Sequence, residues 1–491
     1  MLAAGATPPQ EPLRRRELRP PMRYLALCCD YDGTLATDGR LLPETVRSLE
    51  HFLASGRRLV MVTGRELDDL KRVCERLDLF QYVVAENGAL LYDPGTGAET
   101  LLAERPPERF LAALRNRGVQ PMSVGRIIVA TWEPHETTVL RAIRDFGLEL
   151  QVIFNKGAVM VLPAGVNKAS GLRAALARMG LSARNAVGVG DAENDHALLG
   201  MCECGVAVSN ALPTLKDAAD WVTTADHGAG VAELADEIVL NDLASRVPLL
   251  TRHRITVGWD ANGDEIRVPP YGETILIAAD APTSGPLQNA LLARVRDRGY
   301  TFCVVDPSGT QEAPQGTVVL GSAQRPPALD DALKLLANPS DNAVLNTSAV
   351  AESERYGFFE ALWLRLQRAS EQIGLPHWLV LNEAQRLPTL PSYGSSTPQT
   401  VLQIMTPPST LPAKTLAQVD LLLITGKDAR RKLEDFSRAT GTPLPENTPR
   451  GDPDAGELWA WRPRVSQAPV VQLTLAAPAS VTKVHSRKAH V

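Results

Sequence analysis

The chain has 491 residues, 44% hydrophobic and 22% charged, which is ordinary for a globular protein of about two to four domains. Its net charge of −5 offers no basic footprint for nucleic acid, and no apolar run is long enough to span a membrane. The six cysteines are scattered and fit neither a disulfide framework nor a zinc site, so we expect a cytoplasmic protein with reduced thiols.

The first 21 residues contain three consecutive arginines without a following apolar region. They are predicted to be a disordered arm and not a signal peptide, with Met22 as an alternative start. The apolar run Tyr24–Cys29 follows and ends in Asp30-Tyr31-Asp32-Gly33-Thr34-Leu35. Ligands bind at the carboxyl ends of strands in open α/β sheets, so this run is predicted to be a buried strand that carries a phosphoryl-transfer site.

The two carboxylates of this segment explain that prediction. Each would repel a phosphate dianion by roughly 4 kcal/mol per unit-charge pair at about 4 Å, so a cation must lie between them, and Mg²⁺ suits oxygen ligands. Asp30 is then free to attack phosphorus and form an aspartyl-phosphate, while Asp32 acts as general acid and base. The alternative is an ordinary turn in which the carboxylates cap a loop.

A second apolar run, Arg58–Val62, leads into Thr63, Gly64 and Arg65. The hydroxyl of Thr63 and the N–H that follows it are expected to hold phosphate oxygens. The same Thr-Gly pair is also a common start for a helix, and that alternative stays open.

Two later segments complete the pattern. Lys168 lies at a predicted helix start, from which its ammonium can neutralise both nucleophile and phosphate, although a solvated lysine is the alternative. The strand-like run Ala186–Gly190 ends at Asp191, which is predicted to bind the metal. Asn194 and Asp195 are expected to orient ligands or Lys168.

In this order the four segments resemble the haloacid dehalogenase superfamily, in its branch of Cof-type and sucrose-phosphatase-like hydrolases. The resemblance implies that Asp30 is the nucleophile, Asp32 the acid and base, and Thr63 the phosphate-binding hydroxyl. It makes Lys168 the stabilising lysine and implies a Mg²⁺ site made by Asp30, Asp191 and the main-chain carbonyl of Asp32, with Asp195 beside it. Residues expected to contact the substrate are Gly33, Thr34, Gly64, Arg65, Asn87, Gly88 and Asn194.

The resemblance also divides the first half into a core, residues 22–87 and 166–245, and an inserted cap, residues 88–165. Such a type-two cap closes over the site, excludes water and reads the leaving group. Asn87-Gly88 and Pro163–Gly165 are candidate hinges. The cap elements predicted from the pattern are helices at Pro107–Arg117 and Glu136–Phe146 and strands at Arg126–Thr131, Leu150–Phe154 and Ala158–Leu162. Four cap residues are candidates for determining specificity: Arg126, Trp132, His135 and Lys156. For each of them the alternative is an ordinary surface or core role.

The second half, residues 255–465, alternates strand-like and helix-like segments and is predicted to be another doubly wound α/β domain. Its first strand–loop–helix, Asp280–Leu287, occupies the position of a phosphate-binding loop. Only Gly285 fits that motif, because Pro286 replaces the lysine and Leu287 the hydroxyl.

Downstream segments nevertheless resemble a P-loop ATPase of the translocase or helicase-like kind. These are Val304–Gly309 and His377–Gln385, in which Asn382 replaces the metal-associated Asp and Glu383 is retained as a possible base. The resemblance implies a degenerate ATPase domain, regulatory or structural, for which nucleotide binding is doubtful. The alternative is an unrelated α/β sheet.

The remaining segments are connections. Asn241–Thr256 is a predicted junction, Leu387–Gln399 an exposed loop, and residues 466–491 a loosely attached tail. The whole is therefore expected to be an α/β protein with a Rossmann-like parallel core, an inserted α/β cap and a second, P-loop-like α/β domain.

The function expected of this protein is Mg²⁺-dependent hydrolysis of a small phosphate monoester, such as a sugar phosphate or a phosphoglycolate-like compound. Its partner is a small phosphorylated metabolite, with no membrane and no nucleic acid. One alternative is a phosphomutase or phosphotransferase of the same superfamily, which returns the phosphoryl group to an alcohol. Another is a nonenzymatic, ligand-sensing regulatory protein.

Overall fold

The continuous apolar run Ala26–Cys29 forms β1, and each of its residues is buried, as expected of a strand covered on both faces of a parallel sheet. The computed structural model describes residues 22–387, 399–405 and 408–476. The predicted arm of residues 1–21 lies outside these ranges, as does most of the predicted loop 387–399. None of the helices in the described ranges has the length and hydropathy needed to cross a membrane.

Within the described residues, eight strands form the first sheet, in the order β12-β11-β10-β1-β2-β3-β4-β5. Both neighbours of β1 are parallel to it. The strands are β1 Ala26–Cys29, β2 Arg58–Val62, β3 Tyr82–Ala85, β4 Leu90–Asp93, β5 Ala98–Leu101, β10 Ala186–Gly190, β11 Cys204–Ala207 and β12 Trp221–Val222. The helices around them are α1 Pro43–Ala54, α2 Leu67–Val73, α5 Lys168–Met179, α6 His196–Met201, α7 Pro213–Ala218 and α8 His227–Asn241.

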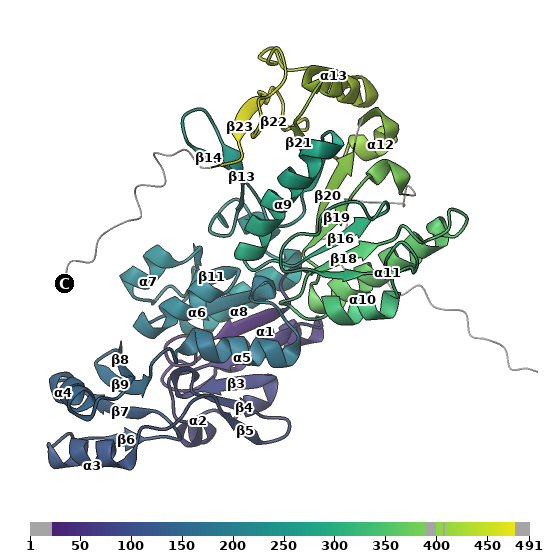
Figure 1. The fold of residues 1–491 in the computed structure, drawn as a ribbon. Coiled ribbons are helices and arrows are strands. Elements are labelled where there is room, and N and C mark those ends of the chain that lie inside the picture. Colours follow the sequence, from purple (N-terminus) through teal and green to yellow (C-terminus); the bar gives the residue numbers. More distant parts are fainter. Residues whose placement is uncertain (1–21, 388–398, 406–407, 477–491) are drawn as a thin grey trace, which may run out of the picture.

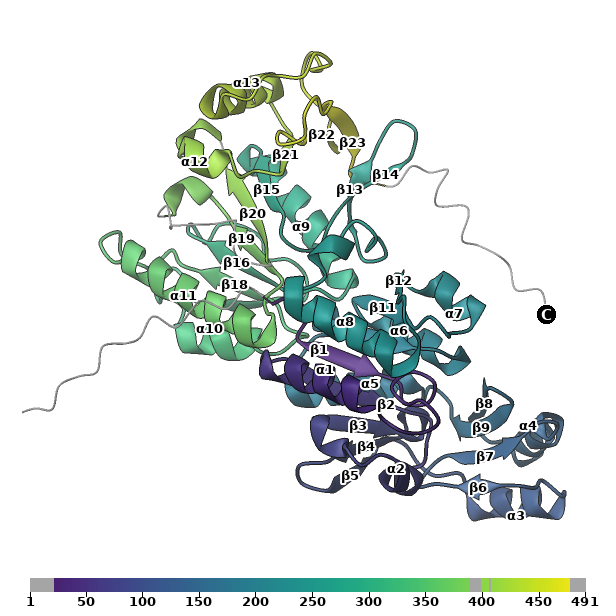
Figure 2. The ribbon, with the colours of Figure 1, turned by 180° about the vertical axis from the view of Figure 1, so that it is seen from behind.

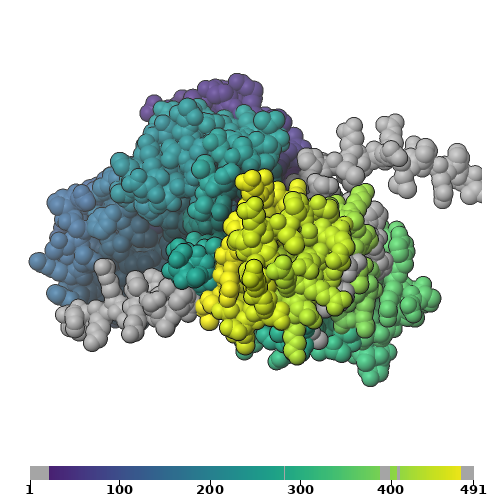
Figure 3. Space-filling model, turned by 90° about the horizontal axis from the view of Figure 1, so that it is seen from above, coloured from purple at the N-terminus to yellow at the C-terminus, as the bar shows by residue number. Residues whose placement is uncertain are grey.

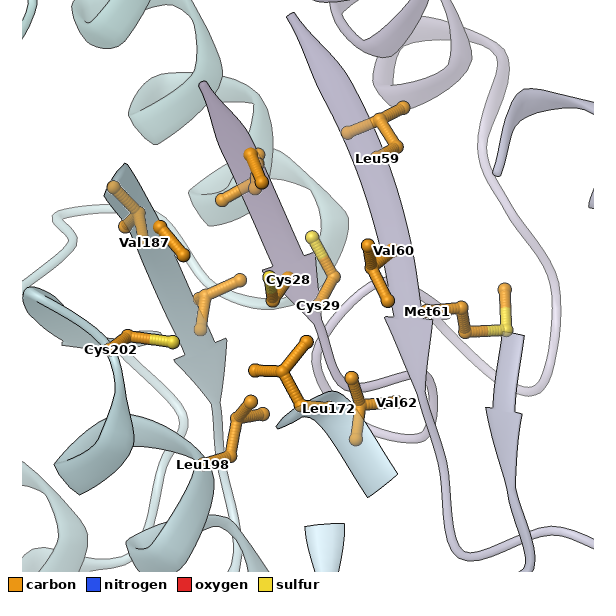
Figure 4. Packing of buried hydrophobic residues seen from close by; sticks show 14 of the residues in the cluster. Cys28, Cys29, Leu59, Val60, Met61, Val62, Leu172, Val187, Leu198 and Cys202 are labelled. Carbon is orange, nitrogen blue, oxygen red and sulfur yellow. The ribbon is translucent and has the colours of Figure 1, made fainter. Parts of the chain in front are cut away.

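The first sheet is covered by helices on both faces. Helix α1 packs against α8, and α5 packs against α6. Figure 1 shows α5 and α6 in front of the sheet, and Figure 2, from behind, shows α1 and α8 in front. In Figure 4, Cys28 and Cys29 of β1 lie between Val187 of β10 and Val60 of β2, with Leu172 of α5 and Leu198 of α6 nearby. The six cysteines are all buried and free, in line with the expected reduced thiols.

The cap is a small α/β module whose sheet, in the part of the chain that the structure describes, has four strands in the order β6-β7-β9-β8. Its elements are β6 Ser123–Val124, β7 Val129–Trp132, β8 Leu150–Asn155, β9 Ala158–Pro163, α3 Glu108–Asn116 and α4 Glu136–Phe146. The predicted boundary of the cap at residue 88 is wrong. Strands β4 and β5 extend the core sheet through antiparallel pairs with β3 and with each other, so residues 90–101 belong to the core.

The second half builds a further sheet, which across the described ranges has eleven strands in the order β14-β13-β23-β22-β21-β15-β20-β19-β16-β18-β17. The strands are β13 Ile255–Trp259, β14 Glu265–Val268, β15 Thr274–Ala278, β16 Phe302–Asp306, β17 Val318–Leu320, β18 Ala343–Asn346, β19 Trp378–Leu381, β20 Thr400–Met405, β21 Leu421–Ile424, β22 Glu457–Trp461 and β23 Val471–Thr474. Its helices are α9 Ala281–Asp297, α10 Leu329–Leu336, α11 Arg355–Ile373, α12 Ala413–Leu416 and α13 Ala429–Thr440. The mixed α/β class predicted for both halves is confirmed.

The interpretation of residues from 466 onward as a tail is wrong for Val471–Thr474. These residues form β23, which pairs antiparallel with β22 and meets β13 at Trp259. Residues 477–491 lie outside the described ranges.

The two halves meet at the amino edges of their sheets. In the first half the contact residues Arg184 and Asn185 directly precede β10, and in the second half Tyr271 and His377 precede β15 and β19. The Tyr271 hydroxyl donates to the Arg184 carbonyl at 2.6 Å, and His377 Nε2 lies 3.3 Å from Asn185 Oδ1. Figure 3 shows the two halves, purple to teal and green to yellow, as adjoining bodies.

A buried charge network reinforces this junction. Glu203, which precedes β11, accepts hydrogen bonds from Arg23 and, at 2.6 Å, from the hydroxyl of Tyr300. The Arg23 guanidinium lies over the Tyr271 ring at 4.1 Å. Because both carboxyl edges point away from this junction, the cap lies at the end of the first half that is remote from the second, as Figures 1 and 2 both show.

Candidate functional site

Four strands of the core end at one edge, and each is followed by a residue that the sequence singled out. Asp30 follows β1, Thr63 follows β2 and Asp191 follows β10, while Asn87 lies two residues beyond β3. The four strands are parallel neighbours, so their carboxyl ends converge. Asp30 and Asp191, which meet here, are 161 residues apart in sequence.

Lys168 enters this edge at the start of α5. Asn167 and Ser170 form a capping box that fixes where the helix begins. The loop after β3 lies so close to this helix that a Cβ at Gly88, where φ is +105°, would stand 1.9 Å from the Asn167 carbonyl oxygen. Glycine is therefore required at position 88 to bring the helix start, and Lys168 with it, to the edge of the sheet.

The ammonium of Lys168 joins two carboxylates in the interior. Its Nζ lies 2.5 Å from Asp30 Oδ1 and 2.6 Å from Asp195 Oδ1, and all three side chains are buried. Burial acts to lower the pKa of Lys168, but the carboxylates of Asp195 and Asp30 outweigh it and raise that pKa. Burial and the neighbouring Asp195 raise the pKa of Asp30 to about 8, with Lys168 acting in the opposite direction.

Among the described residues, Asp30, Asp191 and Asp195 form an acidic cluster. One carboxylate oxygen of each lies within 4.8 Å of the other two. Asp195 uses both oxygens inside the protein, since Oδ1 accepts from Lys168 and Oδ2 from the N–H groups of Asp191 and Ala192 at 3.0 and 3.1 Å. The partners of Asp195 are a buried ammonium and backbone N–H groups, whereas those of Asp191 are a hydroxyl at 3.3 Å and the half-exposed Lys156, so Asp30 and Asp191 are the better ligands for a cation. The carboxylate oxygens suit a hard divalent ion such as Mg²⁺.

Asp32 lies outside that cluster, in a salt bridge with Arg65. The guanidinium of Arg65 donates to both Asp32 oxygens, at 2.6 and 2.7 Å, and to Asp69 at 2.5 Å. It lies over the ring of Tyr31. Arg65, which the sequence predicts to contact the substrate, lines the cleft and is also the partner of Asp32.

The remaining predicted residues surround the cluster. The side chain of Thr63 is buried and accepts from the Arg65 N–H at 3.1 Å, and Thr34 donates to Asp191 Oδ1 at 3.3 Å. Asn194 donates to Asn87 Oδ1 at 3.1 Å, and both side chains are buried. The Asn87 amide nitrogen and the Asn194 carbonyl oxygen have no protein partner among the described residues.

Gly33 is the point of closest approach between the first loop and Asp191. A Cβ there would lie 2.3 Å from Asp191 Oδ2, and the backbone φ is +82°. Only glycine allows this turn to bring Asp30 and Asp191 together. Gly64 is less restricted, since a Cβ there would meet Asn194 Nδ2 at 3.5 Å and Met160 Sδ of the cap at 3.7 Å.

A cleft of about 490 Å³ lies between this edge and the cap. From the core it is lined by Asp30, Asp32 and Arg65. The cap contributes mainly apolar side chains, among them Met122, Ile128, Trp132 and Met160, together with the charged Lys156. The cleft is therefore charged on its core side and largely apolar on its cap side.

The four cap residues that the sequence predicts to determine specificity fall into two groups, those that line the cleft and those that do not. Trp132 and Lys156 line the cleft. Arg126 pairs instead with Asp68 and Glu99 of the core, and His135 hydrogen-bonds to Gln120 within the cap. These two residues support the fold and do not line the cleft.

Glu86 is a site-supporting residue that the sequence analysis missed. Its buried carboxylate accepts the N–H groups of Arg126, Ile127 and Ile128, at 2.7, 2.7 and 2.9 Å. Glu86 has a φ of +53°, which turns its side chain from the end of β3 toward the cap. Its position beside Asn87-Gly88, a predicted hinge, was the available signal.

In the second half, Asp280 is the N-cap position of α9, and the helix takes up the segment predicted as a loop. The Asp280 carboxylate accepts from Lys432 at 2.9 Å and from the Lys427 N–H at 2.9 Å. Glu383 lies just beyond β19, with a φ of +44°, and pairs with Arg386 at 2.6 Å. Asn382 is buried beside it.

Comparison with known proteins bears on the first half. Residues 27–122 and 133–234 match the family model of haloacid dehalogenase-like hydrolases. A phosphoglycolate phosphatase of Methanothermobacter thermautotrophicus is 32% identical over 217 residues, which are 42% of this chain and 96% of that protein. Phosphoglycolate phosphatase 2 of Saccharolobus solfataricus is 28% identical over 231 residues, 46% of this chain and 97% of that protein. A solved subclass IIB sugar phosphatase is 21% identical and covers 43% of this chain and 98% of that one, with a TM-score of 0.37.

The fold and the matched sequence define a hydrolase. The chain belongs to the haloacid dehalogenase-like hydrolases, through its N-terminal half. The prediction of an enzyme of this superfamily is confirmed.

Proposed function

We propose that the N-terminal half is a Mg²⁺-dependent phosphatase that hydrolyses a small phosphate monoester through an aspartyl-phosphate on Asp30. The observation that carries this proposal is the buried Lys168, which bridges Asp30 and Asp195 beside Asp191. A binding protein has no need for a buried nucleophile held by an ammonium in this way. The phosphoglycolate phosphatases among its relatives favour a substrate of phosphoglycolate size.

The residues fit Mg²⁺ by the chemistry of the donors. Asp30 and Asp191 offer carboxylate oxygens within 4.8 Å of one another, and the main-chain carbonyl of Asp32 is proposed as a further ligand. Asp195 is proposed to hold Lys168 and the loop at Asp191 rather than to bind the ion, because its oxygens accept from a buried ammonium and from backbone N–H groups of that loop. When bound, Mg²⁺ supplies positive charge between the carboxylates and the phosphate and polarises the phosphoryl oxygens.

The protein groups then divide the chemistry into two steps. Asp30 attacks phosphorus while the bond to the ester oxygen breaks, and Asp32 gives the departing oxygen a proton. In the second step Asp32 takes a proton from water as the water oxygen bonds to phosphorus, and the bond to Asp30 breaks to release phosphate. Thr63 and the adjacent N–H hold phosphate oxygens, and Lys168 offsets the negative charge on Asp30.

The cap is proposed to exclude water and to recognise the leaving group. Its apolar side chains, including Met122 and Met160, cover the acidic floor of the cleft. Excluding water strengthens the interactions of Lys168 and the carboxylates with the reacting phosphate. A cleft of about 490 Å³ suits a small leaving group.

For the second half we propose a P-loop-like domain, residues 255–465 together with β23, with impaired nucleotide chemistry and a regulatory or structural role. The start of α9 directly at Asp280 supports this, because no glycine-rich loop remains there to surround phosphates. Glu383, the candidate base, is held by Arg386. We expect no ATP turnover, and hydrolysis that Glu383→Gln abolishes would overturn this part of the proposal.

The primary experiment measures Mg²⁺-dependent release of phosphate from an aryl phosphate and from phosphoglycolate. Asp30→Asn should lose activity by at least about a thousandfold, as expected when a nucleophile is removed. Asp297→Asn, an exposed carboxylate on α9, is the matched control and should keep full activity. Equal activity of Asp30→Asn and the parent would end the proposal, and transfer of the phosphate to an alcohol instead of water would indicate a phosphotransferase.

A further inference from the structure

Lys156 reaches from the cap into the acidic cluster. It lies in the turn between β8 and β9, with a φ of +48°, and Gly157 follows at +84°. Its Nζ is 2.6 Å from Asp191 Oδ2, and a Cβ at Gly33 would lie 2.8 Å from that nitrogen. The ammonium therefore contacts both a proposed cation ligand and the loop that carries Asp30 and Asp32.

The contacts between cap and core have two different kinds of chemistry. At one end, Glu86 accepts three cap N–H groups from a buried position, and Arg126 pairs with Asp68 and Glu99. At the other end the link is Lys156, whose side chain is 49% exposed, to Asp191, whose side chain is 3% exposed. The first end resembles an anchor, whereas the second is a contact that water and ions can reach.

Charge explains why the second contact forms. Lys168 is already paired with Asp30 and Asp195, at 2.5 and 2.6 Å. Asp191 accepts a neutral hydroxyl, that of Thr34, on one oxygen and the ammonium of Lys156 on the other. Lys156 therefore supplies the positive charge that Asp191 faces directly. A divalent cation bound by Asp191 would supply the same charge at the same carboxylate.

We propose that Lys156 is a latch: its ion pair with Asp191 holds the cap against the core, and a divalent cation at Asp191 competes with it and releases the cap. The proposal rests on the proposed function only in that the cation is the one the phosphatase uses. Cation binding and release of the cap are then coupled, and by linkage each favours the other. Binding of the cation and entry of the substrate into the site are then coupled.

The test of the latch is the affinity for Mg²⁺ without substrate, measured by titration calorimetry. Lys156→Gln removes the competing charge and should bind Mg²⁺ about fivefold more tightly, the change expected when a half-exposed ion pair is lost. Lys156→Arg keeps the charge and should behave as the parent does. Lys71→Gln is the matched control, since Lys71 is also part-exposed and pairs with a carboxylate, Glu99, that is not in the cluster.

A second measurement follows the cap itself. All six cysteines are buried, so spin labels can be placed selectively on cysteines introduced at Leu140 of α4 and Leu240 of α8, which are 52% and 82% exposed. In the parent, Mg²⁺ should broaden the distance distribution between the labels. In Lys156→Gln the distribution should be broad before Mg²⁺ is added.

An unchanged or weaker Mg²⁺ affinity in Lys156→Gln would overturn the latch, as would a distance distribution identical to that of the parent. Lys156 would then assist the cation or act on the substrate alone. Both measurements are made without turnover. A protein that binds Mg²⁺ with these properties but releases no phosphate would refute the proposed function and leave the latch intact.

Discussion

Both oxygens of Asp32 accept from one guanidinium, that of Arg65, at 2.6 and 2.7 Å. This two-point contact fixes the plane of the carboxylate in a way that a single-point donor cannot. Arg65 also binds Asp69 at 2.5 Å, so it ties the proposed acid and base to α2. The residue that positions Asp32 thus comes from the end of a different strand.

Arg65→Lys should lower kcat about tenfold and leave KM nearly unchanged, because the lysine keeps the charge but loses the second contact to Asp32. Steady-state kinetics with an aryl phosphate measure both constants, and circular dichroism checks the fold. A raised KM with an unchanged kcat would instead make Arg65 a substrate-binding residue, as its place after Thr63-Gly64 predicted.

Lys168→Met should destabilise the protein as well as inactivate it. The substitution leaves Asp30 and Asp195 buried without their shared cation, and breaking a buried ion pair costs on the order of 3 kcal/mol. Urea unfolding measures the loss. Lys334→Met, on the exposed face of α10, is the control and should change stability by less than about 0.5 kcal/mol. A stable but inactive Lys168→Met would mean that the pair serves catalysis alone.

Glu86→Gln should loosen the attachment of the cap. The amide offers one acceptor oxygen where the carboxylate offered two, so N–H groups among Arg126, Ile127 and Ile128 lose their partner. Hydrogen exchange resolved by peptide should speed up at residues 126–128. Exchange within β1 and β10 serves as the internal reference and should not change. Unaltered exchange at 126–128 would show that other contacts hold the cap.

The junction between the halves should weaken in mild acid. Burial lowers the pKa of His377 to about 3, and its Nδ1 accepts the Thr301 N–H at 2.8 Å, so the folded protein holds the neutral ring. Below the ordinary pKa of 6.5 the unfolded chain binds a proton that the folded protein does not, and stability falls as the pH decreases from 6.5. The loss approaches about 1.4 kcal/mol per pH unit for this group.

Urea unfolding at several values between pH 6.5 and 5 measures that slope. His377→Gln removes the titrating ring. The slope of its free energy of unfolding against pH should therefore be smaller by the contribution of one proton. Equal slopes for the two proteins would indicate that His377 titrates freely in the folded state.

The sequence placed the candidate residues at one edge of the sheet, because these residues follow apolar runs. Asp30, Thr63 and Asp191 each come directly after a buried strand, and such runs are readable from composition. Lys168 was found from its helix start. The sequence could not show that Arg65 bonds to Asp32, since that contact depends on how two loops face each other.

Other errors have the same origin in long-range packing. Residues 90–101 were assigned to the cap because their order in the chain places them after the presumed hinge, whereas pairing with β3 puts them in the core. Strand β23 has too few residues to show a pattern in the sequence, and it is defined by its pairing with β22. Lys156 had no signal beyond its charge, because its partner Asp191 is 35 residues away.

The amino-edge junction between the two sheets has a consequence for how this fused chain can work. The cleft of the first half opens on the side turned away from the second half, so the product of the proposed phosphatase leaves into solvent without crossing the junction. An influence of the second half on this cleft would therefore act along the strands of the first sheet, from the charges around Glu203 at one edge to the acidic cluster at the other.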